Sequence, residues 1–342
     1  MDQNVLKSDA IPTADRKLLD RVLLAFSKMY LFLVFAIIIG LGAVLSPYFL
    51  NLRNLTNIIT AASITSVLAV GQFFVIVTGG IDLSVGSLAA LSTVVSAIVL
   101  ANHYPALVAI LLTFLTCGTV GLANGALIVY ARITPFIATL AMLSIVEGFS
   151  YIIQTGELIQ ISDTSFTSLF AGSIGPIPAP VIIFLVIMVA AAFLMSNFTF
   201  GRELYAIGGN REAARLSGLP INRDLLLAYA ISGLLAGLAG LMLASQLLEG
   251  SSLVGRGYEL DSIAAVVVGG ASLFGGSGDP IRSVIGGLII ATILNIMNLM
   301  GIQSQPQLVI KGFVILIAVF FSSGDAPRRL LRSLGSLSRR RR

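Results

Sequence analysis

Residues 201–224 read GRELYAIGGNREAARLSGLPINRD, a polar segment inside an otherwise very apolar chain. The segment contains four arginines, whereas residues 54–201 contain a single basic residue, Arg132. Polar loops rich in Lys and Arg between membrane spans stay on the cytoplasmic side. The segment therefore predicts a membrane protein with several spans, and it marks a cytoplasmic loop long enough to bind a soluble partner.

The composition of the whole chain supports this prediction. Hydrophobic residues make up 56% of the 342 residues and charged residues 11%, whereas a soluble domain carries about a quarter charged residues. The pI near 9.6 does not indicate nucleic-acid binding, because the basic residues gather near the chain ends, in residues 7–28 and 328–342. Basic residues in those places favour contact with anionic lipid headgroups.

Several kinds of site are excluded by residue type. Cys117 and His103 are the only cysteine and the only histidine, so the chain has neither an internal disulfide nor a metal site built from cysteines. A Ser-His-Asp set is not possible in the apolar region, and no G-x-x-x-x-G-K-[ST] nucleotide loop occurs. We therefore expect a protein that is not an enzyme and holds no cofactor and no metal.

The apolar segments predict an all-α protein with about ten membrane spans, because a helix needs about 20 apolar residues to cross the hydrocarbon core. With the N-terminus inside, alternation places 201–224 and the C-terminus on the cytoplasmic side. Residues 154–180, which lack Lys and Arg, fall outside. We expect a cytoplasmic segment 1–28, a transmembrane domain 29–322 with its cytoplasmic loop 200–224, and a cytoplasmic basic tail 323–342. The predicted spans are approximately 29–46, 57–78, 83–101, 105–130, 135–153, 181–199, 225–247, 262–277, 283–300 and 305–322.

The two halves of the chain suggest an inverted repeat. A division near Phe170 leaves five spans on each side, and an odd number reverses the second half relative to the first, as in many transporters. The sequence support is weak, because TGGIDLSVGSLAALSTVVS and GYELDSIAAVVVGGASLFGG share only an acidic residue at the start of an apolar helix of small residues. The repeat is therefore a hypothesis.

Glycine pairs predict close helix packing. Gly121 and Gly125, and likewise Gly233 and Gly237, form G-x-x-x-G. Such spacing lets two helix backbones approach each other in a membrane.

Polar residues within the apolar segments are candidates for a translocation path. Gly79 and Gly80 disfavour helix, so we expect a broken helix whose second half begins near Asp82. Asp82 then either caps this half or lines the path, and the same alternatives apply to Glu259 and Asp261. Amide side chains either join helices or bind a solute. The candidate path residues are Asp82, Ser84, Glu147, Gln246, Glu259, Asp261 and Asn295.

Four motifs, in the same order, resemble the permease subunits of bacterial ribose-type ABC importers. They are TGGIDLSVGS at 78–87, GGNREAARLSG at 208–218, ISGLLAGLAG at 231–240 and YELDSIAAVVVGGASLFGG at 258–276. The resemblance covers nearly the whole chain from the second span onward. It departs at GGSGDPIRSVIGG, residues 275–287, where relatives often have a GT-type continuation after the glycines.

This resemblance implies the pore-forming subunit of an ATP-driven monosaccharide importer in the bacterial inner membrane. Its implied partners, besides the bilayer, are a cytoplasmic ABC ATPase, an extracytoplasmic sugar-binding protein, and a second permease copy or paralogue. No nucleic acid is implied. The family motif G-x-N-x-x-A-A-x-x-x-G implies an ATPase-coupling helix at Gly208, Asn210, Ala213, Ala214 and Gly218.

Two alternatives remain open. One is an ion-coupled secondary transporter that uses Asp82, Glu147 or Asp261 as its ion site. The other is an ABC permease for a non-sugar, such as a furanosyl signalling compound or a polyol.

Overall fold

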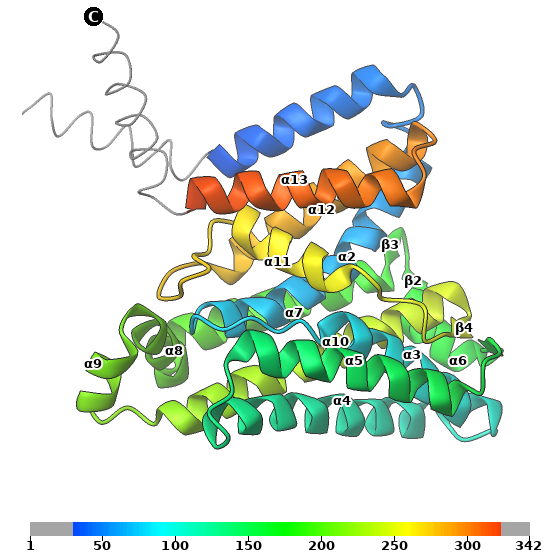
Figure 1. Ribbon diagram of the computed structural model, residues 1–342. Coiled ribbons are helices and arrows are strands. Elements are labelled where there is room, and N and C mark those ends of the chain that lie inside the picture. Colours follow the sequence, from blue (N-terminus) through cyan, green and yellow to red (C-terminus); the bar gives the residue numbers. More distant parts are fainter. Residues whose placement is uncertain (1–29, 323–342) are drawn as a thin grey trace, which may run out of the picture.

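The computed structural model describes residues 30–322, which form a bundle made mainly of helices (Figure 1). The predicted N-terminal segment 1–28 and basic tail 323–342 lie outside the described residues. The helices are Tyr30–Leu45, α2 (Leu52–Ile76), α3 (Val85–Ala101), α4 (Ala106–Val129), α5 (Pro135–Gln154), α6 (Thr164–Ala171), α7 (Ala179–Asn197), α8 (Thr199–Gly209), α9 (Arg211–Leu216), α10 (Ile221–Leu247), α11 (Tyr258–Val268), α12 (Pro280–Leu299) and α13 (Ser304–Ser322).

Two short antiparallel strand pairs lie at one end of the bundle. Strand β1 (Ile159–Gln160) pairs with β4 (Glu249–Gly250), and β2 (Ser173–Ile174) pairs with β3 (Ile177–Pro178). Together with α6 they occupy the end away from α8 and α9 (Figure 1).

Six of the helices within residues 30–322 are long and apolar enough to cross a membrane, namely α2, α4, α5, α7, α10 and α12. They confirm a helical protein with several membrane spans. The apolar helices Tyr30–Leu45, α3 and Ser304–Phe320 of α13 are shorter, and α11 has only 11 residues. The count of ten spans therefore stays a prediction.

The predicted helix break after the second span is present. Helix α2 ends at Ile76 and α3 begins at Val85, with residues 77–84 outside either helix. Gly79 has a φ of +80°, a left-handed conformation that favours glycine. The second half begins three residues later than we expected, with Ser84 rather than Asp82 at the N-cap position.

A second break corrects the predicted span 262–277. The helix there, α11, already ends at Val268. Four of the glycines that follow have positive φ, at Gly270, Gly275, Gly276 and Gly278, and a run of left-handed residues cannot continue a right-handed helix. Residues 269–279 therefore form a loop.

The N-terminal ends of α3 and α11 meet inside the bundle. A Cβ atom added to Gly86, the second residue of α3, would overlap the Gly255 carbonyl oxygen and the Glu259 carboxylate. A side chain larger than hydrogen is therefore excluded at Gly86, and the contact holds the two broken helices end to end.

The G-x-x-x-G motifs pack α4 against α10, as predicted. A Cβ on Gly233 would lie 3.0 Å from the Gly121 Cα atom, and a Cβ on Gly125 would lie 3.0 Å from the Leu226 Cα atom. The motifs thus pack the chain against itself.

Candidate functional site

A buried polar network surrounds Asp82, in the break between α2 and α3. The Asp82 side chain is fully buried. Its Oδ1 atom accepts hydrogen bonds from the Ser84 amide at 3.0 Å and the Ser84 hydroxyl at 2.6 Å, and its Oδ2 atom accepts one from the Ser232 hydroxyl at 2.8 Å. Asn124 of α4 donates to Ser84 Oγ at 2.9 Å. Because Ser232 lies near the middle of α10, the network lies well inside the bundle.

Asp82 forms no ion pair within residues 30–322, so hydroxyl and amide donors alone stabilise its carboxylate. Its backbone is held by Gln72 of α2: with the amide group turned to satisfy both atoms, Nε2 donates to the Asp82 carbonyl oxygen at 3.0 Å and Oε1 accepts from the Asp82 amide at 3.1 Å. These bonds fix the break rather than cap α3. Local hydrogen bonds therefore satisfy the buried Asp82 carboxylate without a bound solute.

Two polar atoms beside this network lack a hydrogen-bond partner among the described residues, the Tyr229 hydroxyl and Asn124 Oδ1. The Tyr229 hydroxyl faces the break closely, since a Cβ on Gly80 would lie 2.5 Å from it. Unsatisfied buried polar atoms cost about 1–3 kcal/mol each. The break region therefore has hydrogen-bonding capacity that this arrangement does not use.

Backbone contacts join the break to the polar segment 201–224. The Gly276 amide donates to the Val77 carbonyl oxygen at 2.9 Å. A Cβ on Gly208 of α8 would overlap the same carbonyl, and a Cβ on Gly275 would lie 2.9 Å from the Gly208 Cα atom and 2.7 Å from the Gly79 amide nitrogen. Helix α8, residues 77–84 and the 269–279 loop therefore meet at what we call the glycine junction, formed by Gly79, Gly208, Gly275 and Gly276.

Helices α8 and α9 form a projection at one end of the bundle (Figure 1), and the predicted coupling motif, residues 208–218, covers the end of α8 and the whole of α9. Asn210 caps α9, its Oδ1 atom accepting from the Ala213 amide at 2.9 Å. Ala214 is buried in a cluster with Ile207 and Ile221. Gly218 ends the projection with a φ of +77°.

These contacts divide the five predicted coupling residues by role. Gly208 and Ala214 face the protein itself and Asn210 shapes α9, whereas Ala213 and Gly218 are exposed. The exposed surface also carries charged side chains and Leu216, which is 75% exposed. Arg215 binds Glu212, and its guanidinium lowers the pKa of the Glu212 carboxyl below the usual value.

Arg223 braces the projection against α10. Its guanidinium lies 2.8 Å from the Glu203 carboxylate of α8 and 2.8 Å from Asp224 of α10. One ion pair, between Glu203 of α8 and Arg223 of α10, and the glycine junction therefore attach the projection to the bundle.

Glu147 is remote from Asp82. It lies on α5, and its carboxylate accepts a hydrogen bond from Arg256, in the segment before α11. The pair lines a hollow of about 290 Å³ together with Ser144, Gly148, Tyr151, Ser252 and Leu253.

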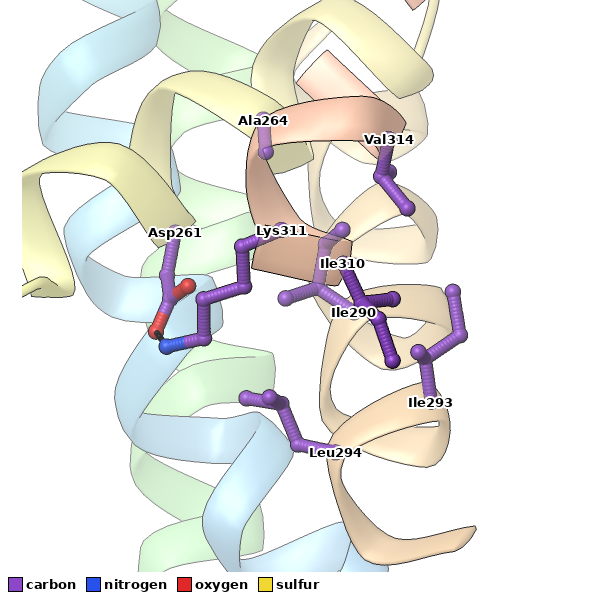
Figure 2. Close-up of a pocket in the computed structure, with 8 residues that line it drawn as sticks. All are labelled: Asp261, Ala264, Ile290, Ile293, Leu294, Ile310, Lys311 and Val314. Carbon is purple, nitrogen blue, oxygen red and sulfur yellow. Dashed lines mark hydrogen bonds and ion pairs between the residues drawn. The ribbon is translucent and has the colours of Figure 1, made fainter. Parts of the chain in front are cut away.

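Asp261 forms a second, more buried ion pair with Lys311 of α13, at 2.7 Å between Oδ2 and Nζ. The side chains are 5% and 16% exposed, and Figure 2 shows them among aliphatic residues of α12 and α13. The pair joins α11 to α13. The sequence analysis did not identify Lys311 and Arg256 as partners of the two carboxylates. For Lys311 the sequence did contain one indication, a single lysine within a predicted span.

The other three candidate path residues have separate surroundings. Both Glu259 carboxylate oxygens accept from the Gly257 amide, at 3.1 and 3.2 Å, which favours a capping role. Asn295 of α12 and Asn54 of α2 exchange amide hydrogen bonds of 3.0 and 2.9 Å, which joins two helices. Gln246 is exposed. The structure thus brings Asp82 and Ser84 together and places Glu259 near them, against Gly86 of α3. Asp261 follows Glu259 in the first turn of α11, whereas Glu147, Gln246 and Asn295 lie apart.

Comparison with known proteins adds the following findings. Residues 54–319 match the family described as branched-chain amino acid transport system / permease component. The chain is 38% identical over 287 residues to the ribose import permease protein RbsC of Escherichia coli (strain K12), covering 83% of this chain and 89% of that protein. No solved structure gives a significant match.

Two further relatives come from the same organism. The D-allose transport system permease protein AlsC is 39% identical over 298 residues, covering 86% of this chain and 91% of the relative. The L-arabinose transport system permease protein AraH is 36% identical over 288 residues, covering 84% and 88%.

Proposed function

The chain belongs to the branched-chain amino acid transport system permease family, and its curated relatives are permeases for sugars; on this premise we propose that it is the membrane-spanning subunit of an ABC importer for a monosaccharide such as ribose. Its proposed partners are a cytoplasmic ABC ATPase, an extracytoplasmic sugar-binding protein, and a second permease copy or a paralogue. ATP hydrolysis belongs to the ATPase.

The observation that carries this proposal is the attachment of the α8–α9 projection to the break after α2. Gly208 packs directly on the Val77 carbonyl, and residues 77–84 lead from there to Asp82 and the start of α3. A soluble ATPase that closes on ATP would move an exposed projection as a rigid lever. That movement reaches the interior of the bundle through backbone contacts, with no flexible side chain between.

The proposed topology has ten spans, with both termini in the cytoplasm of a bacterium and the protein in the inner membrane. In support, the described chain begins and ends at the same end of the bundle as α8 and α9 (Figure 1). Tyr30 also reaches the end of α11, its hydroxyl donating to the Val268 carbonyl oxygen at 3.4 Å.

An inverted repeat is part of the same proposal. Helix α4 packs on α10 through Gly121 and Gly233, and α12 packs on α2 through Gly287, which faces Ser66. In a five-plus-five repeat these two helix pairs correspond. The segments that lead into α3 and α11, residues 77–84 and 248–257, correspond as well, and the inverted repeats of transporters commonly use interrupted helices at their centre.

The ion-coupled alternative is less well supported. Two of its three candidate residues, Glu147 and Asp261, already have a basic partner, which neutralises the charge that would attract a cation. A neutral sugar needs no opposite charge; hydroxyl, amide and backbone groups suffice to exchange hydrogen bonds with it.

The test is uptake by proteoliposomes in which the chain is assembled with its proposed ATPase and sugar-binding partners. ATP is enclosed in the lumen, and uptake of labelled D-ribose, D-allose and L-arabinose is measured with and without an uncoupler. We expect uptake of at least one of these sugars that requires ATP and resists the uncoupler. Uptake that persists without ATP and collapses with the uncoupler would instead establish ion coupling.

A further inference from the structure

The Glu147–Arg256 pair lies on the lateral surface of the bundle, within the length of α5. Glu147 is seven residues before the end of α5 at Gln154, or about 10 Å along the axis. Gly255, next to Arg256, packs on Gly86 where the two broken helices meet. The pair therefore lies about two helical turns inside the end of α5 at Gln154, near the point where the starts of α3 and α11 meet.

Both members of the pair are open to the surroundings of the chain. The Arg256 side chain is 66% exposed and the Glu147 side chain 33% exposed. Ionised side chains within membrane segments face water or protein rather than lipid. Lipid is therefore not the neighbour of this surface.

Helix α5 carries two exposed stripes that differ in chemistry. Ser144, Glu147, Gly148 and Tyr151 are related by spacings of three and four residues, which place them on one face of the helix, and all of them line the hollow. The adjacent stripe carries Ile145, Phe149 and Ile152, which are 61%, 55% and 70% exposed. One stripe thus suits water and the other suits hydrocarbon.

The groups in the hollow suit a polyhydroxylated molecule. The Arg256 guanidinium offers several N–H donors in one plane, and the Glu147 carboxylate offers two acceptor oxygens. The Tyr151 side chain, 60% exposed, adds a ring beside them, and Ser144 adds a hydroxyl. The net charge of the pair is zero, so it would not favour an ion over a neutral sugar.

We propose that this hollow, between α5 and the segment 252–256, is a sugar-binding wall of the water-filled translocation path. Glu147 and Arg256 would exchange hydrogen bonds with the hydroxyl groups of a neutral monosaccharide as it leaves the binding protein. The proposal rests on the sugar import proposed above and adds the residues that the solute meets. The buried Asp82 network and the Asp261–Lys311 pair lack such an opening.

The first experiment compares cysteines placed at Ser144 and Ile145, which are neighbours at the same depth on different stripes. Both are made in a Cys117→Ala background within the assembled transporter, in right-side-out membrane vesicles. A charged, membrane-impermeant methanethiosulfonate is added outside. We expect S144C to react at least about tenfold faster than I145C, because only a thiol in water forms the reactive thiolate. Equal rates would overturn the proposal.

The second experiment measures ATP-driven D-ribose, D-allose and L-arabinose uptake by Glu147→Gln in the same vesicles, using Glu157→Gln on the exposed outer loop as the control. We expect E147Q to lower the maximal rate of uptake about tenfold, with S144C still labelled at its original rate when combined with E147Q. Normal uptake by E147Q would overturn sugar binding at this wall.

The experiments also separate this inference from the proposed function. If the unsubstituted protein takes up none of the three sugars, the proposed import itself fails. If it takes up at least one of them and the two cysteines react equally, only the inference about this wall fails.

Discussion

The amide of Gly276 donates a hydrogen bond to the carbonyl oxygen of Val77 at 2.9 Å, although 199 residues separate them in the sequence. Gly208 packs on the same carbonyl. Two irregular segments, residues 77–84 and 269–279, and the end of helix α8 therefore hold one another through their backbones. Such contact requires glycine at each position, because a Cβ atom would fill the space between the chains.

Replacement of Gly208 by alanine tests the glycine junction. Its Cβ would overlap the Val77 carbonyl, and overpacking of this kind costs about 1–3 kcal/mol. We expect Gly208→Ala to lower the melting temperature in detergent by several degrees and to reduce ATP-driven sugar uptake. Gly209→Ala is the matched control, since a Cβ on Gly209 meets nothing within 4 Å. Equal behaviour of the two variants would contradict a role for this junction.

Asp82 offers a test of whether its charge or its shape matters for folding. In Asp82→Asn, Oδ1 still accepts from Ser84 and the new amide group donates to the Ser232 hydroxyl, so we expect near-normal expression and a loss of about 1 kcal/mol or less. Asp82→Leu leaves the donors of Ser84 and Ser232 unpaired, each at a cost of about 1–3 kcal/mol. Thermal unfolding of the purified variants compares them. If Asn were as damaging as Leu, the negative charge itself would be required.

Local sequence patterns predicted the features that depend on a few neighbouring residues. Gly79 and Gly80 predicted the break after α2, and the G-x-x-x-G spacing predicted close helix packing, although not that α4 and α10 are the two helices that approach each other. The C-terminal limit of α11 was predicted less well: its apolar pattern continues to about residue 277, but the glycines from Gly270 onward adopt positive φ. Gly275 and Gly276 adopt it where they pack on Gly208, and Gly270 where it faces the Tyr30 hydroxyl, contacts that only the folded chain provides.

The pairing of charges could not be predicted in this way. Glu147 and Arg256 are 109 residues apart, and Asp261 and Lys311 are 50 apart. No spacing rule links residues on different helices at such separations. The sequence indicated that isolated charges in apolar segments need partners, but the choice of partner depends on how α5, α11 and α13 are placed.

The Asp261–Lys311 pair predicts that removing one of its two charges destabilises the protein more than removing both. Lys311→Met leaves a carboxylate that is almost fully buried without its partner (Figure 2), which costs about 3–5 kcal/mol. Asp261→Leu combined with Lys311→Met removes both charges, so we expect the double variant to be clearly more stable than Lys311→Met alone. Thermal unfolding of the single and double variants measures this coupling. Additive losses would mean that the two side chains do not stabilise each other.

Substitution of Asn210 tests whether the ATPase needs an ordered α9 helix. Asn210 Oδ1 accepts from the Ala213 amide at 2.9 Å, and loss of an N-cap acceptor costs about 1 kcal/mol. Because α9 has only six residues, Asn210→Ala should unfold it locally and weaken co-purification of the ATPase, while the membrane helices stay folded. Asn210→Asp keeps an acceptor and adds a negative charge that the start of a helix favours, so it should retain the ATPase. Retention by both variants would show that the partner does not need an ordered α9, and loss by both would indicate that it recognises the Asn210 amide itself.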